Sequence, residues 1–384
     1  FSETPIKTFV KVGPLPDYQE KTLTMLDSMD YAANAGMVPA IAAIGDKDVF
    51  WDCHVIMGKA MEREGLKMVN LVSPGTGHAI DPANHKEQMR LIGEYVAKGM
   101  ELVPKEIRFV TWTLKYSRSF WFLVLGLKEH YVRTEIRARI AEDGVIEVNE
   151  LTNVRAFAIS LPPEWAKRIR IGKQELQIAR SEEEPKSALF QEKDGVWVQC
   201  LLPDIKGKRP GLQGPIDDAF ASRFLCVRGT GKPWNDGVQA WADAGLKRFA
   251  DEWRVWFRGE LPIKNDTEVS AEDLKTRNLI LFGDPGSNPW IGKALPSLPL
   301  AWTREEVRLR GKTYGAADHA PVLICPSPLP GAENRYVVLN SGHTFHPDEL
   351  KINYLFFPRL GDWAVMKMGE KAPVDAGLFD ENWK

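Results

Sequence analysis

Helix and strand patterns alternate over the first hundred residues, and this alternation restricts the possible folds more than any other feature. Residues 19–33 predict a helix, Pro39–Ile44 a strand, 52–65 a helix and Lys67–Val72 a second strand. Asp81-Pro82 then begins another helix that runs to Gly99, because Asp caps a helix and Pro suits its first turn. This alternation of helices and strands predicts a mainly parallel sheet with helices packed on it.

The pattern changes after residue 105. Short apolar runs separated by polar turns predict β-strands at 107–114, 120–127, 132–140, 145–148 and 154–161. Several short strands at this spacing are typical of an antiparallel sandwich. The segment 181–186 reads as a charged loop.

A Gly-, Pro- and Lys-rich stretch at 206–215 predicts a linker, and alternating strand and helix patterns resume after it. Strands are predicted at 223–227, 278–282, 322–325 and 336–339, and a long helix at 234–257. We therefore expect three domains, at 1–102, 103–205 and 206–384.

Bulk composition excludes several classes of protein. The formal net charge is −2 over 384 residues, so nothing indicates a nucleic-acid partner. No apolar run is long enough to cross a bilayer. The four cysteines are widely spaced, which argues against both a disulfide framework and a zinc site.

Two polar side chains follow the two predicted strands of the first domain. Asp48 comes after the first strand in Gly45-Asp46-Lys47-Asp48, and His78 comes after the second in Gly75-Thr76-Gly77-His78. An acid after one strand and a histidine after the next is the order that closes an α/β-hydrolase sheet. We expect Asp48 to orient His78, which acts as the general base, and Asp46 is a competitor for the acid.

The segment PAIAAIGDKDVFWDCHVIMGKAMEREGLKMVNLVSPGTGH resembles the end of the catalytic domain in the prolyl oligopeptidase family. The stretches KRPGLQGPIDDAF, NLILFGDPGSN and YVVLNSGHTF resemble large bacterial prolyl-oligopeptidase-like proteins with added domains. The resemblance implies the carboxy-terminal part of an α/β-hydrolase domain, followed by a β-sandwich-like domain and a second, smaller α/β domain. It implies a serine hydrolase, either a peptidase or an esterase, that needs no cofactor or metal. Its G-x-x-D arrangement favours Asp48 over Asp46.

The nucleophile elbow G-x-S-x-G does not occur in the sequence, and neither Ser287 nor Ser341 fits it. We expect the nucleophile upstream of Phe1 or on a partner chain, with the missing half of the protein remaining associated. A non-catalytic glycan- or protein-binding or assembly protein on a degenerate hydrolase scaffold is the alternative. A homo-oligomer is a further option, and a periplasmic or secreted location is a working hypothesis.

The other histidines, the loop 283–288 and the tryptophans are interpreted mainly as structural. His54 and His85 on the two helices are interpreted as structural. The segment Gly342–Glu349 carries two histidines and two acids, a weak metal signal. The loop 283–288 is favoured as a tight turn over a ligand site, and the tryptophans of 234–257 are favoured as a core or interface stripe over a sugar platform.

Overall fold

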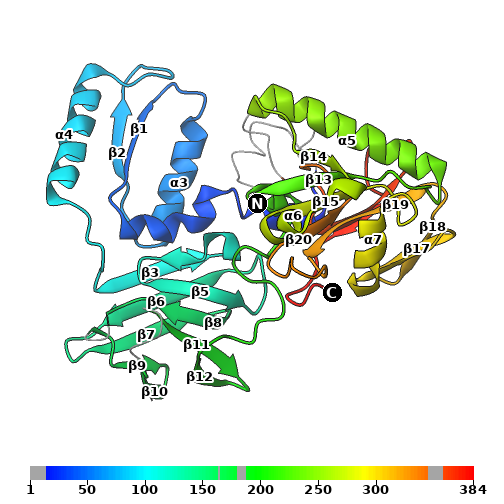
Figure 1. Cartoon of the computed structure of the whole chain (residues 1–384). Coiled ribbons are helices and arrows are strands. Elements are labelled where there is room, and N and C mark those ends of the chain that lie inside the picture. The colour runs from blue at the N-terminus through cyan, green and yellow to red at the C-terminus, as the bar shows by residue number, and fades with distance from the viewer. Residues whose placement is uncertain (1–13, 163–164, 180–186, 345–357) are drawn as a thin grey trace. The chain divides into compact units, whose positions relative to one another are not determined.

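The computed structural model describes residues 14–162, 165–179, 187–344 and 358–384, and shows a mixed α/β protein with several sheets. The chain divides into two compact units. Residues 24–205 belong to the first unit, and Leu15–Leu23 with Lys206–Lys384 form the second (Figure 1). The charged loop predicted at 181–186 lies outside the described residues.

A two-stranded parallel sheet begins the first unit. Strand β1 (Ile41–Gly45) pairs in register with β2 (Val69–Ser73). Helix α3 (Trp51–Arg63) joins the two strands, and α4 (Pro82–Lys98) follows β2. Figure 1 shows the two helices on opposite sides of the sheet. These elements match the sequence prediction closely, including the Asp81 cap and the stop at Gly99.

The helix predicted at 19–33 is wrong as a single element. The chain forms α2 (Asp17–Leu23), and then a separate 3-10 helix, η1 (Ser28–Met37), whose first turn is capped by the Asp27 side chain. Asp27 is an efficient helix cap, so it favours a new start at this point over continuation of α2.

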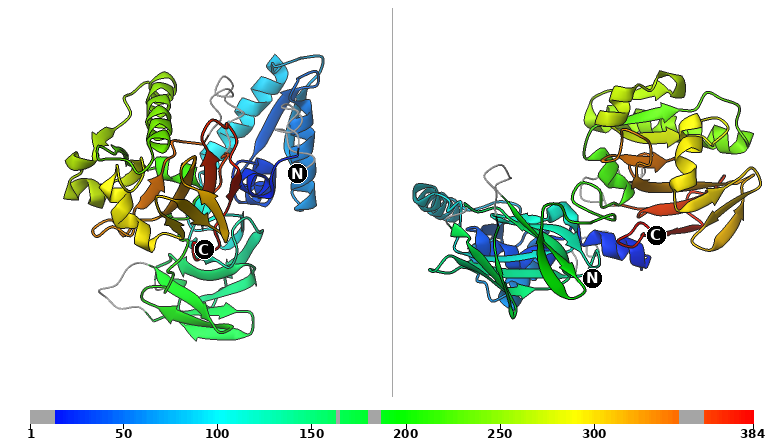
Figure 2. Two further views of the ribbon diagram at one scale, coloured as in Figure 1. Left: turned by 90° about the vertical axis from the view of Figure 1, so that its right-hand side faces the viewer. Right: turned by 60° about the horizontal axis from the view of Figure 1, so that its bottom comes forward.

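The sandwich of the first unit consists of two five-stranded sheets around one apolar core (Figure 2). The first sheet has the order β10-β9-β7-β6-β3 and the second β12-β11-β8-β5-β4. All neighbours are antiparallel except β7 and β9. Their bounds are β3 (Glu106–Thr111), β4 (Arg118–Ser119), β5 (Phe122–Leu127), β6 (Thr134–Ile140), β7 (Val145–Leu151), β8 (Val154–Ile159), β9 (Arg168–Ile171), β10 (Gln174–Gln177), β11 (Ala188–Lys193) and β12 (Val196–Cys200).

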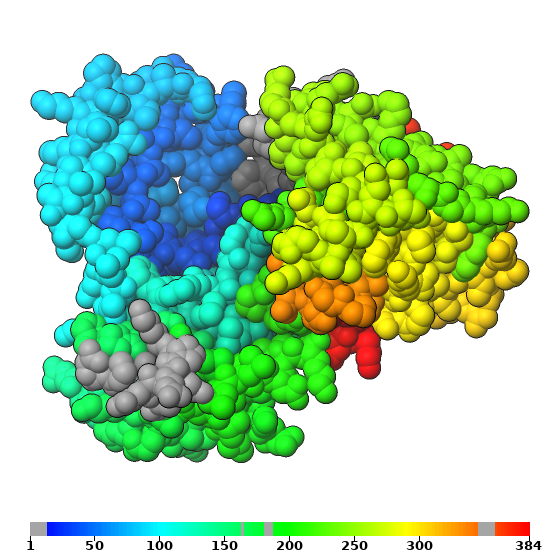
Figure 3. Space-filling view, viewed as in Figure 1, coloured from blue at the N-terminus to red at the C-terminus, as the bar shows by residue number. Residues whose placement is uncertain are grey.

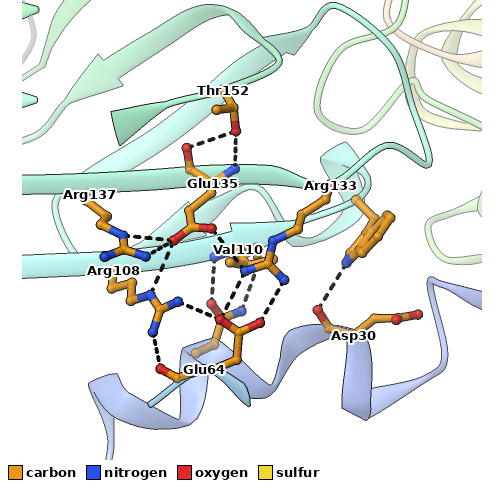
Figure 4. A network of polar contacts seen from close by, with 10 residues as sticks. Asp30, Glu64, Arg108, Val110, Arg133, Glu135, Arg137 and Thr152 are labelled. Carbon is orange, nitrogen blue, oxygen red and sulfur yellow. Dashed lines mark hydrogen bonds and ion pairs between the residues drawn. The ribbon is translucent and has the colours of Figure 1, made fainter. Parts of the chain in front are cut away.

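A polar network joins α3 and η1 to the sandwich (Figure 4). Glu64, at the end of α3, forms ion pairs with Arg108 of β3 and with Arg133. Glu135 of β6 forms ion pairs with the same two arginines. The Asn34 side chain also donates to the Val110 carbonyl and accepts from its N–H, at 2.8 and 2.7 Å. The segment that carries α3 is therefore fixed to the sandwich by both charge and hydrogen bonds.

The second unit is built on a seven-stranded sheet of order β14-β13-β15-β20-β19-β21-β22. The first four strands are parallel and the last three antiparallel to their neighbours. Figure 1 shows helix α5 (Asp236–Phe257) along this sheet, and its buried residues are Val238, Ala242, Leu246 and Phe249. The strand bounds are β13 (Phe224–Arg228), β14 (Ile263–Asn265), β15 (Asn278–Phe282), β19 (His319–Pro326), β20 (Tyr336–Leu339), β21 (Trp363–Lys367) and β22 (Asp375–Gly377).

The remaining elements of the second unit are short. A three-stranded antiparallel sheet contains β16 (Leu300–Trp302), β17 (Glu306–Leu309) and β18 (Lys312–Gly315). Two short helices are α6 (Ala271–Thr276) and α7 (Pro289–Ala294).

The stretch predicted as a linker at 206–215 contains a fully buried residue. The Lys208 ammonium lies 2.7 Å from the Asp362 carboxylate, and neither side chain is exposed. The prediction of a linker is therefore wrong at this point. Gly207 allows close packing of the backbone, since a Cβ at this position would overlap the Glu381 carbonyl.

Candidate functional site

The Asp48 carboxylate is held by the backbone at the start of α3. Strand β1 ends at Gly45, and α3 begins at Trp51. The Phe50 N–H donates to Asp48 Oδ1 at 2.9 Å, and the Asp48 side chain is only 6% exposed. This N–H is the largest cause of a lowered Asp48 pKa, which His78 lowers further, against an opposing contribution from burial. Asp48 is therefore a carboxylate at neutral pH.

His78 stands on the loop between β2 and α4. Gly75 adopts a positive φ of 72°, which glycine permits at low cost, and it bends the chain after β2. The Thr76 hydroxyl lies 3.0 Å from the Ser73 carbonyl oxygen and 2.9 Å from that of Ala79. The loop is thus braced on both sides of His78, while the imidazole itself is 80% exposed.

The two side chains meet directly. His78 Nδ1 lies 2.9 Å from Asp48 Oδ2. Because a carboxylate can only accept, Nδ1 carries the proton, and Nε2 of a neutral imidazole is left as an acceptor. The pair comes from the carboxyl ends of two adjacent parallel strands, where the sequence predicted that it would form.

Asp46 has a different position in the same loops. Its Oδ1 accepts from the Gly75 N–H at 2.7 Å, and its own N–H donates to the Ser73 carbonyl at 3.2 Å. The Lys47 N–H donates to the Thr76 carbonyl at 2.9 Å. Asp46 therefore ties the histidine loop to the acid loop, and Asp48 is the carboxylate that bonds the imidazole.

Gly45 allows these two loops to approach each other. A Cβ at this position would overlap the carbonyl oxygens of both Thr76 and Gly77. The last residue of β1 must therefore lack a side chain for the histidine loop to lie against it. No local signal in the sequence marks Gly45 or Phe50 for these roles, because both depend on contacts between the two loops.

The first unit has three other histidines. His54 Nε2 lies 2.7 Å from Asn70 Oδ1, and its ring stacks on Trp51. His130 is buried, and its ring contacts that of Tyr131. His85 is exposed on α4. None of the three has a described contact with Asp48 or His78.

Both serines that were considered as nucleophiles belong to the second unit. Ser287 is buried, and its Oγ accepts from the Asp284 N–H at 3.0 Å. Ser341 Oγ donates to the Gly342 carbonyl at 2.8 Å. Each hydroxyl is engaged in its own turn.

The loop 283–288 is a tight turn built around Asp284. Its two carboxylate oxygens accept four backbone N–H groups, from Trp234, Asn235, Gly286 and Ser287. A carboxylate used in this way closes the turn and has little capacity left for a ligand.

The weak metal-site prediction for Gly342–Glu349 rests on two histidines and two acids, of which His346, Asp348 and Glu349 lie outside the described residues. The His343 ring packs against Phe249 and Phe257, and burial lowers the His343 pKa to about 4. Within the described ranges, no three His, Cys, Asp or Glu side chains are arranged to hold a metal ion.

The predicted tryptophan stripe on α5 divides between buried and exposed positions. Trp241 and Trp253 pack against the core of the second unit, whereas Trp256 is 41% exposed. No helix in the described part of the chain is long and apolar enough to cross a membrane.

Comparison with known proteins found no matching family model, no matching curated protein and no matching solved structure.

Proposed function

We propose that the protein is part of a serine hydrolase, a peptidase or an esterase of the prolyl oligopeptidase-like type, in which Asp48 and His78 are the acid and the base. The observation that carries this proposal is the 2.9 Å contact between His78 Nδ1 and Asp48 Oδ2. A carboxylate on Nδ1 fixes the tautomer whose Nε2 can accept a proton, which is what a serine nucleophile requires of its base.

The proposed reaction has two steps. A serine hydroxyl attacks the acyl carbonyl while His78 Nε2 takes its proton, and His78 then gives that proton to the departing amine or alcohol. Water, activated by the same nitrogen, attacks the acyl-enzyme and releases the acid and the serine. Asp48 remains ionised throughout and stabilises the imidazolium. The scheme needs protein groups and water alone.

The serine is proposed to lie on chain upstream of Phe1 or on a partner chain. Support comes from the sheet that carries the pair, which has only two strands within the described residues. Within the described residues β1 and β2 pair only with each other, so each strand leaves one edge open, and most sheets have more than two strands. Here Ile41, Ala42, Ala43 and Ile44 of β1 are each only partly buried. A further strand beside this sheet would bury them and bring other catalytic groups to the same edge.

Helix α4 gives independent support. None of its residues is buried, and its Met89 and Val96 are 53% and 75% exposed. Figure 3 shows this helix, in cyan, at the surface of the first unit. An apolar stripe left open on a helix marks a surface that another element covers. The missing part of a hydrolase domain is the partner we propose for it.

The test is intact-mass spectrometry of the purified protein, with any partner chain that accompanies it, after treatment with a fluorophosphonate probe. A single label on an upstream peptide or a partner chain is expected, and His78→Ala should abolish it. His85→Ala, which removes an exposed histidine from α4, is the matched control and should retain labelling. If no component is labelled, the serine hydrolase is excluded and the non-catalytic binding scaffold becomes the better account.

A further inference from the structure

The His78 imidazole has unusually few restraints for a proposed catalytic base. It is 80% exposed, and its hydrogen bond to Asp48 runs through a single nitrogen. The imidazole can turn about its Cβ–Cγ axis, and a single hydrogen bond on an exposed ring resists that turn only weakly. Turning would move Nε2, the atom that must face the nucleophile, and would also carry Nδ1 away from Asp48, so the preference for the Nδ1-protonated tautomer would weaken.

Phe50 supplies a contact away from this axis. Its ring centroid lies 5.7 Å from that of His78, with the two planes inclined at 60°. Tilted aromatic pairs at this separation attract each other beyond simple burial of area. The ring therefore lies where it restricts rotation of the imidazole.

Phe50 also holds the other partner. Its backbone N–H donates to Asp48 Oδ1, which leaves Oδ2 for His78. The main chain of this one residue thus orients the acid, and its side chain contacts the base. These two contributions can be separated, because a substitution at position 50 alters the ring and keeps the N–H.

We infer that Phe50 is a positioning residue for His78: its ring fixes the plane of the imidazole so that Nε2 faces the nucleophile. This inference rests on the proposed function for its catalytic consequence, but its structural part concerns His78 alone. Phe50 does not touch the reacting atoms in this scheme and acts only through His78 and Asp48.

The structural part is tested by nitrogen NMR of histidine-labelled full-length protein, with the His78 signals identified from the His78→Ala spectrum. In the unmodified protein, neutral His78 should be predominantly protonated on Nδ1. Phe50→Leu should shift it toward a mixture of the two tautomers, and Phe50→Tyr, which keeps a ring, should restore the original spectrum. Phe50→Met provides a second ringless variant should the leucine protein fold poorly. Val49→Ala, at an exposed neighbouring position, is the matched control and should leave the spectrum unchanged.

The catalytic part is tested on the assembly that reacts with the fluorophosphonate probe. Phe50→Leu should lower kcat by about tenfold with little change in KM, a smaller loss than the roughly hundredfold that a 1 Å misplacement costs. Phe50→Tyr, which keeps an aromatic ring, should retain most of the original kcat. A leucine variant with unchanged tautomers and unchanged kcat would overturn the inference. Altered tautomers in a protein that never reacts with the probe would support the positioning of His78 by Phe50 and count only against the hydrolase.

Discussion

Lys208 Nζ and Asp362 Oδ2 lie 2.7 Å apart in the interior of the second unit, and neither side chain reaches solvent. The Phe379 N–H also donates to Asp362 Oδ2, at 2.9 Å. The pair therefore joins a residue near the start of this unit to two positions near the end of the chain.

Lys208→Met should destabilise the second unit strongly, because it leaves the Asp362 charge buried without its ammonium. Breaking a buried ion pair from one side typically costs about 3–5 kcal/mol of the free energy of unfolding. Urea unfolding, followed by tryptophan fluorescence, measures this. Lys247→Met removes an exposed pair with Asp251 and should cost less than about 1 kcal/mol. Equal losses in the two variants would contradict the importance of burial.

Asp48→Asn and Asp46→Asn should separate the two acids of the first loop. Asparagine at 48 disturbs the His78 tautomer, and the corresponding change in a serine-protease triad lowers kcat by about 10⁴. Asparagine at 46 keeps an acceptor for the Gly75 N–H, so the loss should stay below about tenfold. The rate of fluorophosphonate labelling measures both. A reversed order would identify Asp46 as the acid.

Gly45→Ala should displace the His78 loop, because the new Cβ overlaps the carbonyl oxygens of Thr76 and Gly77. The downfield proton signal of a hydrogen-bonded Nδ1 should weaken or disappear, and any hydrolase activity should fall by about a hundredfold. Gly93→Ala in α4 is the matched control, since nothing lies within 4 Å of its Cβ. It should stabilise the helix by about 0.5–1 kcal/mol. Retention of the His78 signal in Gly45→Ala would show that the loop can move aside at no cost.

Asp217→Asn should change how stability depends on pH. Burial raises the Asp217 pKa from 3.8 to about 6, against the hydrogen bonds from Thr344 that lower it. The folded state therefore binds this proton more tightly than the unfolded chain, so the stability that Asp217 contributes is full below pH 4 and is lost as pH rises through 6. A shift of about two pKa units corresponds to a loss of at most about 3 kcal/mol.

Asparagine should flatten the stability of the second unit between pH 4 and 7, as measured by urea unfolding at a series of pH values. Asp30 of the first unit also has its pKa raised to about 6, first by burial and then by Asp27. Asp30→Asn is thus the control that removes a separate part of the same pH dependence. An unchanged profile in Asp217→Asn would mean that this carboxyl is not the group responsible.

The sequence predicted the features that depend on local signals. Asp48 and His78 could be paired because each follows a short apolar strand, and parallel strands end at the same edge of a sheet. The Asp81-Pro82 start and the Gly99 end of α4 were also found, since capping depends on residues close in the chain.

Features that depend on distant contacts were missed. Lys208 stands among Gly and Pro residues and looks like part of a linker, and only Asp362, 154 residues later, accounts for its burial. Strands β9 to β12 are only four to six residues long, too short for alternation to distinguish them from loops, and the sequence predicted no strand between 162 and 205. Phe50 had no local signal either, because its contact with His78 exists only once the two loops meet.

Helix α2 belongs to the second unit, and this affects how that unit can be produced as a separate fragment. Residues 15–23 belong with 206–384, whereas 24–205 form the other unit, so the polypeptide leaves the second unit and later returns to it. Tyr18 and Gln19 both donate to the Arg359 carbonyl, at 3.0 and 2.7 Å. A fragment cut at Lys206 would lose these donors. A faithful excised version needs Leu23 spliced to Lys206 through a designed connector, with the first unit treated as an insertion.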